Sequence, residues 1–433
     1  MKIFNPFHKQ RLIAKSLIKM KQLIGPFTQL LTLDQMPLKG ALKDSQLNII
    51  LNGGLMMDGQ MVSEVGSFGK MLKTHGHAPD VELVELKGKN IGLPGFIDCH
   101  THICFEGSRA GDYALRNAGS SYLEIAKKGG GIWDTVGKTR AATQQQLVVR
   151  IVERAKRHFA DGITTIEVKS GYGLSVVEEL KMLRAIQQAD ALCYPDLIST
   201  CLAAHIKPKD FDGDERAYLD WISQELLPIV KQENLSNRID AFVEYGAFGE
   251  DAITTYFKNA QQLGFSITVH ADQFHVGGSK VAAEVNAVSA DHLEASTDNE
   301  INWLAESDVV ATALPGASIG LGCAFAPARK LLDAGACLAI ASDWNPGSAP
   351  MGDLLLQAAI LGSYEKLSNA EVLSGITYRA AHALRMTDRG VLASGKKADL
   401  QIYAVDHYNE ILYHQGRLKP AMVWKNGQLA HKI

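Results

Sequence analysis

The sequence predicts an α/β protein: a (β/α)8 TIM-like barrel with a small β-sandwich domain built from both chain ends. Short apolar strands alternate with helical stretches through the middle of the chain, and this alternation favours a parallel sheet. There are eight such strands, a number that closes into a barrel. Strand-like composition returns after residue 384, as at the start of the chain, with too few strands for a domain of its own.

The first 26 residues form a basic segment. No acidic residue occurs before Asp34, and Ile13, Leu17, Met20 and Ile24 fall at helical spacing. An amphipathic, acid-poor opening is one form of targeting segment, but an ordinary helix with a solvated basic face is the simpler interpretation. We expect residues 1–26 to form a basic N-terminal helix or extension that docks on a partner subunit.

The small domain is expected to combine residues 27–92 with residues 385–433. Apolar runs separated by turn signals predict short antiparallel strands in both parts. Asn-Gly and Asp-Gly pairs flanked by such runs are typical of tight hairpins. The predicted hairpin turns are Asp58-Gly59 and Asn426-Gly427, and Gly53-Gly54 is a further turn signal.

Residues 93–384 are expected to form the barrel. After a first strand that ends before His100, the strand candidates are residues 164–168, 199–203, 239–243, 266–269, 287–290, 309–313 and 336–340. The helical stretches include residues 122–128, 143–160, 176–189, 215–233, 249–261, 280–285, 326–333, 351–361 and 369–384.

Composition narrows the class of protein. The chain has 433 residues, of which 46% are hydrophobic and 21% charged, and its formal net charge is −3. These values are ordinary for a globular protein and argue against nucleic acid as a partner. Six scattered cysteines without a CxxC pair indicate reduced thiols and a cytoplasmic location. No apolar run reaches the length of a membrane span, so we expect no membrane partner.

Two histidines at the end of the first barrel strand carry the first chemical signal. His100 and His102 are spaced i, i+2, so both imidazoles of an extended segment point to one face. Imidazole suits zinc and iron, but a catalytic ion needs further protein ligands and an open position for water.

Later strands supply polar residues at the same edge of the barrel, where active sites of such barrels lie. Any single histidine after a strand is more often an ordinary surface or core residue than a ligand. Several together favour a metal site with a water in the open position. The residues that follow or end these strands are Lys169, His205, Glu244, His270, Asp291-His292 and Asp343.

Several motifs resemble the metal-dependent amidohydrolase superfamily and, within it, most closely the imidazolonepropionase family. The similar segments run through most of the chain. They are residues 94–102 (PGFIDCHTH), 105–109 (FEGSR), 119–125 with 129–131, 164–174, 204–205, 269–274 (VHADQF), 289–293, 342–348 (SDWNPGS) and the tail from residue 377 to residue 400.

The resemblance implies an activity and a site. The implied reaction is the hydrolytic ring opening of 4-imidazolone-5-propanoate to N-formimino-L-glutamate by a metal-bound hydroxide, a step of histidine degradation. One Zn²⁺ or Fe³⁺ per chain would be held by His100, His102, His270 and Asp343. The small anionic heterocyclic substrate would be held by Arg109, Tyr122, Tyr172, His205, Asn345, Gly347 and Ser348. The catalytic residues would be Asp343, His292 and Gln273.

These residue types suit that chemistry. The guanidinium of Arg109 offers a planar fork for a carboxylate, and His292 would stabilise the tetrahedral oxyanion together with the metal. Gln273 stands where some family members have a glutamate, and a glutamine cannot act as a base. The base is therefore expected to be Asp343 or His292. Lys169 follows the second strand, whereas the carbamylated lysine of related binuclear enzymes follows the fourth, so we expect a structural role for it.

Two alternatives stay open at this stage. Another cyclic amidohydrolase or a deaminase acting on a small heterocycle would share His292 and Asp343. The set that favours an anionic substrate is Arg109, Tyr172 and His205. A scaffold that kept the fold without catalysis is disfavoured because every expected metal position is filled. A homodimer is expected from the basic N-terminal segment and the two-ended small domain.

Overall fold

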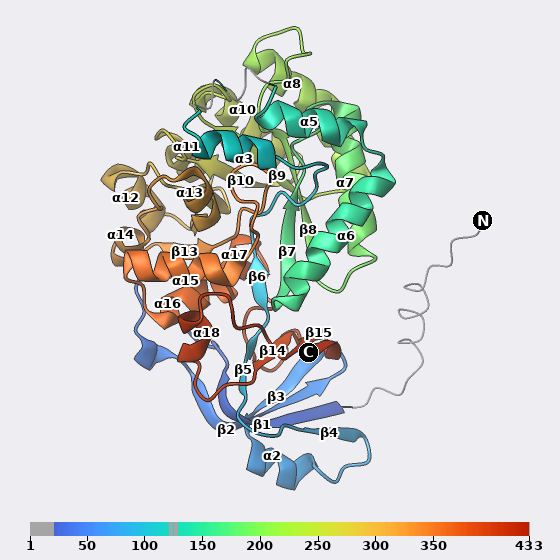
Figure 1. Cartoon of the computed structure of the whole chain (residues 1–433), viewed down its shortest axis with the longest axis vertical. Helices are drawn as coiled ribbons and strands as arrows, with labels where there is room; N and C mark the ends of the chain where they lie inside the picture. Colours follow the sequence, from blue (N-terminus) through green and yellow to red (C-terminus); the bar gives the residue numbers. More distant parts are fainter. Residues whose placement is uncertain (1–20, 121–123, 125–128, 433) are drawn as a thin grey trace, which may run out of the picture.

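A computed structural model describes residues 21–120, 124 and 129–432 of the chain (Figure 1). The described residues form two sheets of eight strands each. One sheet is the barrel, which helices surround in the upper part of Figure 1. The other, which we call the small sheet, lies below it and contains the strands nearest both chain ends.

The barrel strands follow one another in chain order, and every neighbouring pair is parallel. This confirms the predicted eight-stranded barrel. The strands are β6 (Phe96–Asp98), β7 (Ile163–Lys169), β8 (Asp196–Ala204), β9 (Arg238–Val243), β10 (Ser266–Ala271), β11 (Ser289–His292), β12 (Val310–Ala313) and β13 (Cys337–Ile340).

The helices around the barrel pack their apolar sides against these strands. In α6, Thr143 caps the first turn together with Gln146, and Leu147, Ile151 and Ala155 are buried. The helices are α3 (Ala110–Asn117), α5 (Ile132–Ala141), α6 (Gln144–Ala160), α7 (Val176–Asp190), α8 (Glu215–Glu225), α9 (Leu227–Gln232), α10 (Glu250–Gln262), α11 (Gly278–Glu284), α12 (Asp298–Glu306), α13 (Pro315–Leu321), α14 (Ala328–Asp333), α15 (Leu354–Glu365), α16 (Asn369–Gly375) and α17 (Tyr378–Ala383).

Some predicted helices are interrupted. The stretch predicted over residues 215–233 divides into α8 and α9, because Pro228 lacks an amide hydrogen and is tolerated only in a helix's first turn. The stretch predicted over residues 369–384 is also two helices, α16 and α17. The prediction also missed α12, although Thr297 and Glu300 form a capping box at its start.

The small sheet is built from both ends of the chain, as predicted. Its hydrogen-bonded order is β16-β15-β14-β5-β1-β2-β3, with β4 paired to β1. The elements are β1 (Lys21–Leu31), η1 (Asp44–Gln46), β2 (Ile49–Asp58), β3 (Met61–Ser67), α2 (Phe68–His75), β4 (Val81–Glu85), β5 (Ile91–Pro94), β14 (Leu400–Tyr403), α18 (Asn409–Tyr413), β15 (Met422–Lys425) and β16 (Gln428–Lys432).

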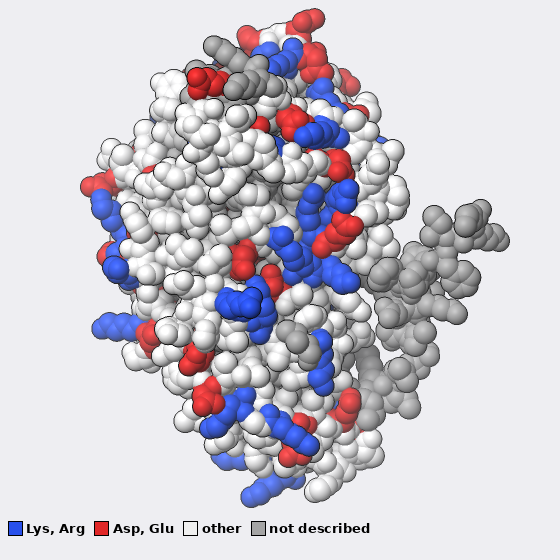
Figure 2. Space-filling view, in the orientation of Figure 1, with Lys and Arg blue, Asp and Glu red and all other residues white. Residues whose placement is uncertain are grey.

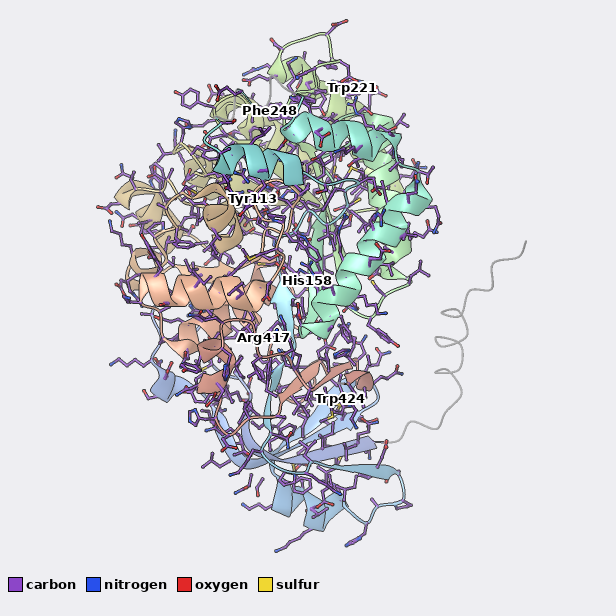
Figure 3. The ribbon with its side chains drawn as sticks, viewed as in Figure 1. Tyr113, His158, Trp221, Phe248, Arg417 and Trp424 are labelled. Atoms are coloured by element: carbon purple, nitrogen blue, oxygen red, sulfur yellow. The ribbon has the colours of Figure 1, made fainter. Side chains whose placement is uncertain are left out.

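The strand directions in the small sheet differ from the prediction. We expected antiparallel strands, but β4 and β5 run parallel to β1. The helix α2, absent from the prediction, makes the crossover from β3 to β4 that parallel strands need. The domain is also one hydrogen-bonded mixed sheet, and its strands share a core that includes Phe27, Leu55, Leu400 and Trp424. Trp424, labelled in Figure 3, is 1% exposed.

Three local predictions about the small domain need correction. Gly53-Gly54 is no turn, since both residues lie inside β2. A Cβ on Gly53 would come within 2.8 Å of the Leu30 Cβ, so glycine permits the close approach of β1. The first strand begins at Lys21, so residues 21–26 belong to the small sheet and Ile24 is not helical. The predicted helix over the earlier residues lies outside the described part of the chain.

The boundary between the domains also shifts slightly. Leu93 and Pro94, assigned to the barrel, belong to β5 and pair with Gln401 and Leu400 of β14. The chain therefore passes from the small sheet to the barrel at Gly95. Both predicted hairpins are confirmed, with Asp58 ending β2 and Asn426-Gly427 joining β15 to β16.

The surface carries charges of both signs. In Figure 2, Lys and Arg side chains lie interspersed with Asp and Glu over the face shown. Among the helices of the described residues, none has the length and apolar composition required to cross a bilayer.

Candidate metal centre and active site

The candidate site lies at the carboxyl ends of the barrel strands, which we call the barrel mouth. His100 and His102 follow β6, and His270 is the penultimate residue of β10. His292 ends β11, and Asp343 lies three residues beyond β13. All five side chains are buried. The fold thus brings together residues that lie up to 243 positions apart in the chain.

Two overlapping groups of these side chains could hold a metal ion: His100 with His102 and Asp343, and His100 with His270 and His292. The Nε2 atom of His102 lies 3.2 Å from His100 Nε2, 3.3 Å from His270 Nε2 and 3.4 Å from Asp343 Oδ1. His100 Nε2 lies 3.6 Å from the same Asp343 oxygen. Such crowding of ring nitrogens around a carboxylate oxygen is the arrangement expected of ligands that share one cation.

The protonation of the histidines fits the same conclusion. Burial lowers the pKa of His100 and of His102 well below the ordinary value, and it also lowers the pKa of His270. All three imidazoles are therefore neutral at pH 7 and present lone pairs. Three neutral imidazoles and one carboxylate form a donor set suited to zinc or iron.

Two buried carboxylates contact the Nδ1 atoms of His100 and His270. Asp291 Oδ2 lies 2.7 Å from His100 Nδ1, and Asp240 Oδ2 lies 2.9 Å from His270 Nδ1. A carboxylate beside Nδ1 keeps the proton on that nitrogen and leaves Nε2 free to bind a metal. Neither residue was predicted to have this role. The available signal was a lone acid within an apolar strand, Asp240, and the acid directly before His292.

The carboxylate of Asp343 is held at both oxygens. Its Oδ1 faces the histidines, while Oδ2 accepts hydrogen bonds from Asn345 Nδ2 at 2.9 Å and Ser348 Oγ at 3.3 Å. Burial raises the pKa of Asp343 to about 6. Its backbone is left-handed, with φ of 51°, a conformation that is uncommon outside glycine and concentrated at functional sites. The structure thus places Asn345 and Ser348 against Asp343.

His292 lies beside this cluster. Its ring centroid is 5.3 Å from that of His270, and its Nδ1 lies 3.4 Å from Glu294. Burial opposes protonation, but the Glu294 carboxylate outweighs it and raises the pKa of His292. The backbone φ of His292 is 94°, so this residue too is held in a strained conformation. A ring favoured in its charged form can donate a hydrogen bond to an oxyanion.

Arg109 lies at the edge of the barrel mouth, in a fixed orientation. Its Nε donates to Asp112 Oδ2 at 2.8 Å, and the same oxygen accepts from the Gly131 amide at 2.8 Å. A Cβ on Gly347 would overlap Arg109 Nη1, so the guanidinium packs directly on that glycine. Arg116 Nη2 donates to the Gly347 carbonyl at 3.4 Å. Asp112 was not predicted, and only its position three residues after Arg109 could have indicated the pair.

Tyr172 and His205 line the other side of the histidine cluster. Their ring centroids are 5.6 Å apart, and those of Tyr172 and His102 are 6.0 Å apart. The Nδ1 of His205 donates to the Gly171 carbonyl at 3.0 Å, and burial lowers the pKa of His205 to about 3. His205 is therefore neutral at pH 7, and its Nε2 is an acceptor.

Of the remaining two predicted residues, Gln273 lies in the described part of the chain and Tyr122 does not. Gln273 is half-buried and lies two residues past β10, after the left-handed Asp272 with φ of 54°. The neighbouring Glu244 fixes this loop, since its Oε2 accepts from the Phe274 amide at 2.9 Å and the His275 amide at 3.1 Å. Tyr122 lies outside the described residues.

A parallel barrel with three buried imidazoles and a carboxylate at its mouth defines a metal-dependent hydrolase. Comparison with known proteins agrees. The model of the amidohydrolase family matches residues 91–430. An imidazolonepropionase of Bdellovibrio bacteriovorus is 36% identical over 389 residues, which cover 89% of this chain and 90% of the relative. An imidazolonepropionase of Fusobacterium nucleatum is 38% identical over 88% of this chain and 92% of the relative. The chain therefore belongs to the imidazolonepropionases, within the amidohydrolase family.

Solved structures share the fold at low sequence identity. An adenosine deaminase from Xanthomonas campestris with bound zinc is similar with a TM-score of 0.68 and 17% identity, over 95% of this chain and 92% of that one. An atrazine chlorohydrolase from Arthrobacter aurescens, complexed with zinc, has a TM-score of 0.66 and 16% identity, over 95% of each chain. At this identity the similarity describes the fold alone.

Proposed function

We propose that this protein hydrolyses the ring of 4-imidazolone-5-propanoate to give N-formimino-L-glutamate, a step of histidine degradation. The observation that carries the proposal is the convergence of His100, His102, His270 and Asp343 at a mouth that Arg109 borders. Membership of the imidazolonepropionases supports the same substrate.

The proposed ligands of one Zn²⁺ or Fe³⁺ are His100, His102, His270 and Asp343. When bound, such an ion polarises a carbonyl and lowers the pKa of a coordinated water towards about 7. The lowered pKa of the three histidines supports this assignment, because a metal competes with protons for the same nitrogen lone pairs.

The propionate of the substrate would bind Arg109. Asp112 occupies Nε, which leaves the two Nη groups of the guanidinium for a carboxylate. Tyr172, whose ring centroid lies 6.0 Å from that of His102, would contact the substrate beside the proposed metal ligands. The neutral Nε2 of His205 is suited to accept a hydrogen bond from a ring N–H of the substrate.

The proton transfers would fall to Asp343 and His292. Water adds to the ring carbonyl carbon, the bond from that carbon to the ring nitrogen breaks, and the nitrogen takes up a proton. The Asp343 carboxylate, with its raised pKa, can accept the proton of the water and pass it to the leaving nitrogen. His292 would donate to the developing oxyanion, and Gln273 would hydrogen-bond the substrate without acting as a base.

A direct assay tests the proposal. The purified protein, stripped and reloaded with either zinc or iron, is given imidazolone propionate, and the loss of substrate absorbance and the formation of N-formimino-glutamate are followed. We expect turnover with at least one metal and none without. Arg109→Ala should raise KM strongly while thermal stability stays near that of the wild type. Turnover of the substrate that is independent of metal, or unaffected by Arg109→Ala, would contradict the proposed site.

We further propose that the enzyme works in the cytoplasm as a homodimer. Cys99, Cys104, Cys201 and Cys337 are buried free thiols, which is consistent with a reducing compartment. Light scattering of the purified protein measures the oligomeric state directly, and a monomer at micromolar concentration would contradict the dimer.

A further inference from the structure

Lys169, the last residue of β7, has no role in the reaction proposed above. Its side chain is 0% exposed. Its Nζ lies 2.7 Å from Glu167 Oε1, 2.8 Å from Asp240 Oδ2 and 3.8 Å from Asp291 Oδ2. A lysine this deeply buried is rare and needs charged partners to remain in the interior.

Two of these partners are the carboxylates that orient metal-ligating imidazoles. Asp240 contacts His270 twice, through Nδ1 at 2.9 Å from Oδ2 and through the backbone amide, which donates to Oδ1 at 3.2 Å. Asp291 Oδ2 contacts His100 Nδ1 and also accepts from Thr268 Oγ1 at 3.1 Å. The Lys169 ammonium thus lies beside the carboxylates that contact two proposed ligands, His270 in β10 and His100 just after β6.

The charge balance of this region depends on Lys169. Burying a carboxylate costs several kcal/mol unless a cation lies beside it, and the Lys169 ammonium lies beside both Asp240 and Asp291. Among the described residues, Lys169 is the only lysine or arginine that forms an ion pair with either of them. Without the ammonium, the two carboxylates lose the cation that holds them in place, and the imidazoles that they contact lose their fixed orientation.

We propose that Lys169 is a positioning residue for the metal centre: its ammonium fixes Asp240 and Asp291, which in turn aim His270 and His100 at the metal. This inference rests on the proposed metal site and deepens it. It also gives Lys169 a role distinct from that of a ligand, since its Nζ is occupied by carboxylate oxygens.

The chain offers a matched control. Lys425 is also buried, with a side chain 3% exposed, and its Nζ lies 2.7 Å from Asp399 and 3.0 Å from Asp196. It therefore bridges two carboxylates as Lys169 does, but its partners contact no residue of the metal centre. Lys425→Met removes an equally buried ammonium without touching the supports of the ligands.

The test is zinc affinity, measured by competition with a chelating dye on the full-length wild type, Lys169→Met and Lys425→Met. We expect Lys169→Met to bind zinc about 10- to 100-fold more weakly, and Lys425→Met to bind like the wild type while melting at a lower temperature. Asp240→Asn should also weaken binding, and combining it with Lys169→Met should cost less than the two separate losses together.

Each outcome bears on the proposal. Wild-type zinc affinity in Lys169→Met would overturn the role of Lys169 and leave the proposed function standing. A wild-type protein without zinc affinity would overturn both. Lys169→Gln, which keeps a hydrogen-bond donor but no charge, serves if the Met variant does not fold, and it too should bind zinc more weakly than the wild type.

Discussion

The backbone amide of Asp343 donates a 3.0 Å hydrogen bond to the carbonyl of His100. A second bond runs from the His102 amide to the Trp344 carbonyl at 2.9 Å, and Thr101 and Trp344 form a parallel bridge. The strands β6 and β13 themselves are not hydrogen-bonded neighbours. The segments that carry the proposed metal ligands therefore also join the first and last strands at the barrel mouth.

This relationship predicts that metal binding stabilises the barrel. Zinc at about 1,000 times its dissociation constant should stabilise the folded protein by about 4 kcal/mol, and the melting temperature should rise accordingly. Asp343→Asn keeps the backbone bond to His100 but removes the carboxylate ligand, so most of this rise should disappear. Calorimetry with and without zinc measures both. An equal rise in the wild type and Asp343→Asn would contradict the prediction.

A substitution at Gly347 should weaken substrate binding through Arg109. A Cβ at this position would overlap Arg109 Nη1, so Gly347→Ala should displace the guanidinium that we propose binds the substrate carboxylate. We expect KM to rise about tenfold, equivalent to about 1.4 kcal/mol of lost binding, with a smaller change in kcat. Steady-state kinetics at fixed metal loading measures the two constants separately.

The control for this substitution is Gly137→Ala. Gly137 lies within α5, and a Cβ there meets no atom within 4 Å. It should leave KM unchanged and stabilise the helix slightly, by about 0.5–1 kcal/mol. If Gly347→Ala behaves as Gly137→Ala does, the packing of Arg109 on Gly347 has no part in substrate binding.

Substitution of Gln273 should lower kcat much less than substitution of Asp343. Because an amide cannot act as a base, Gln273→Ala should lower kcat by only about tenfold, the loss of roughly one hydrogen bond. Asp343→Asn removes both a ligand and the proposed proton carrier and should lower kcat at least about 1,000-fold. Comparable losses in the two variants would assign Gln273 a larger part in the reaction than hydrogen bonding.

The barrel and the polar residues at its mouth follow from local patterns. Apolar strands at regular intervals predicted all eight barrel strands, and a polar residue directly after a strand can only lie at the mouth. His100, His102, His270, His292 and Asp343 were therefore expected at the mouth from their positions, and the resemblance to the amidohydrolases implied which four of them would be ligands. The parts that failed depend on contacts between distant segments. Gly53-Gly54 has the composition of a turn, but it lies in a long strand because Leu30 of β1 packs closely against it.

The supporting residues of the site were missed for the same reason. Asp240 and Asp291 lie inside strands, and their role arises only when barrel closure places them behind His270 and His100. Lys169 was expected to be structural, and its partner Glu167 lies two residues earlier in β7, but Asp240 and Asp291 come from β9 and β11 and leave no local signal. The pattern of a strand predicts the face on which a side chain lies. The residues that this side chain contacts depend on the register of the whole sheet.

The contact between the barrel and the small sheet predicts a loss of stability in Asp196→Asn. Asp196, at the start of β8, lies 2.6 Å from Arg389, 3.3 Å from Lys397 and 3.0 Å from Lys425. Removing the anion leaves the buried Lys425 and Arg389 with fewer partners, although Asp399 and Asp388 still pair with them. We expect a loss of about 1–3 kcal/mol, measured as a lower melting temperature at pH 7.

The pH dependence of this loss has a definite sign. Burial opposes ionisation, but the Lys425 and Arg389 cations outweigh it and hold the pKa of Asp196 well below its usual range. A carboxyl whose folded pKa is depressed contributes stability above its unfolded pKa of about 3.9 and loses it as the pH falls towards the folded pKa. The difference between wild type and Asp196→Asn should thus be constant from pH 7 to about pH 5 and shrink below about pH 4. Asp388→Asn, at a carboxylate that is 43% exposed, should cost less than about 0.5 kcal/mol, and an equal loss in both variants would contradict the role of Asp196.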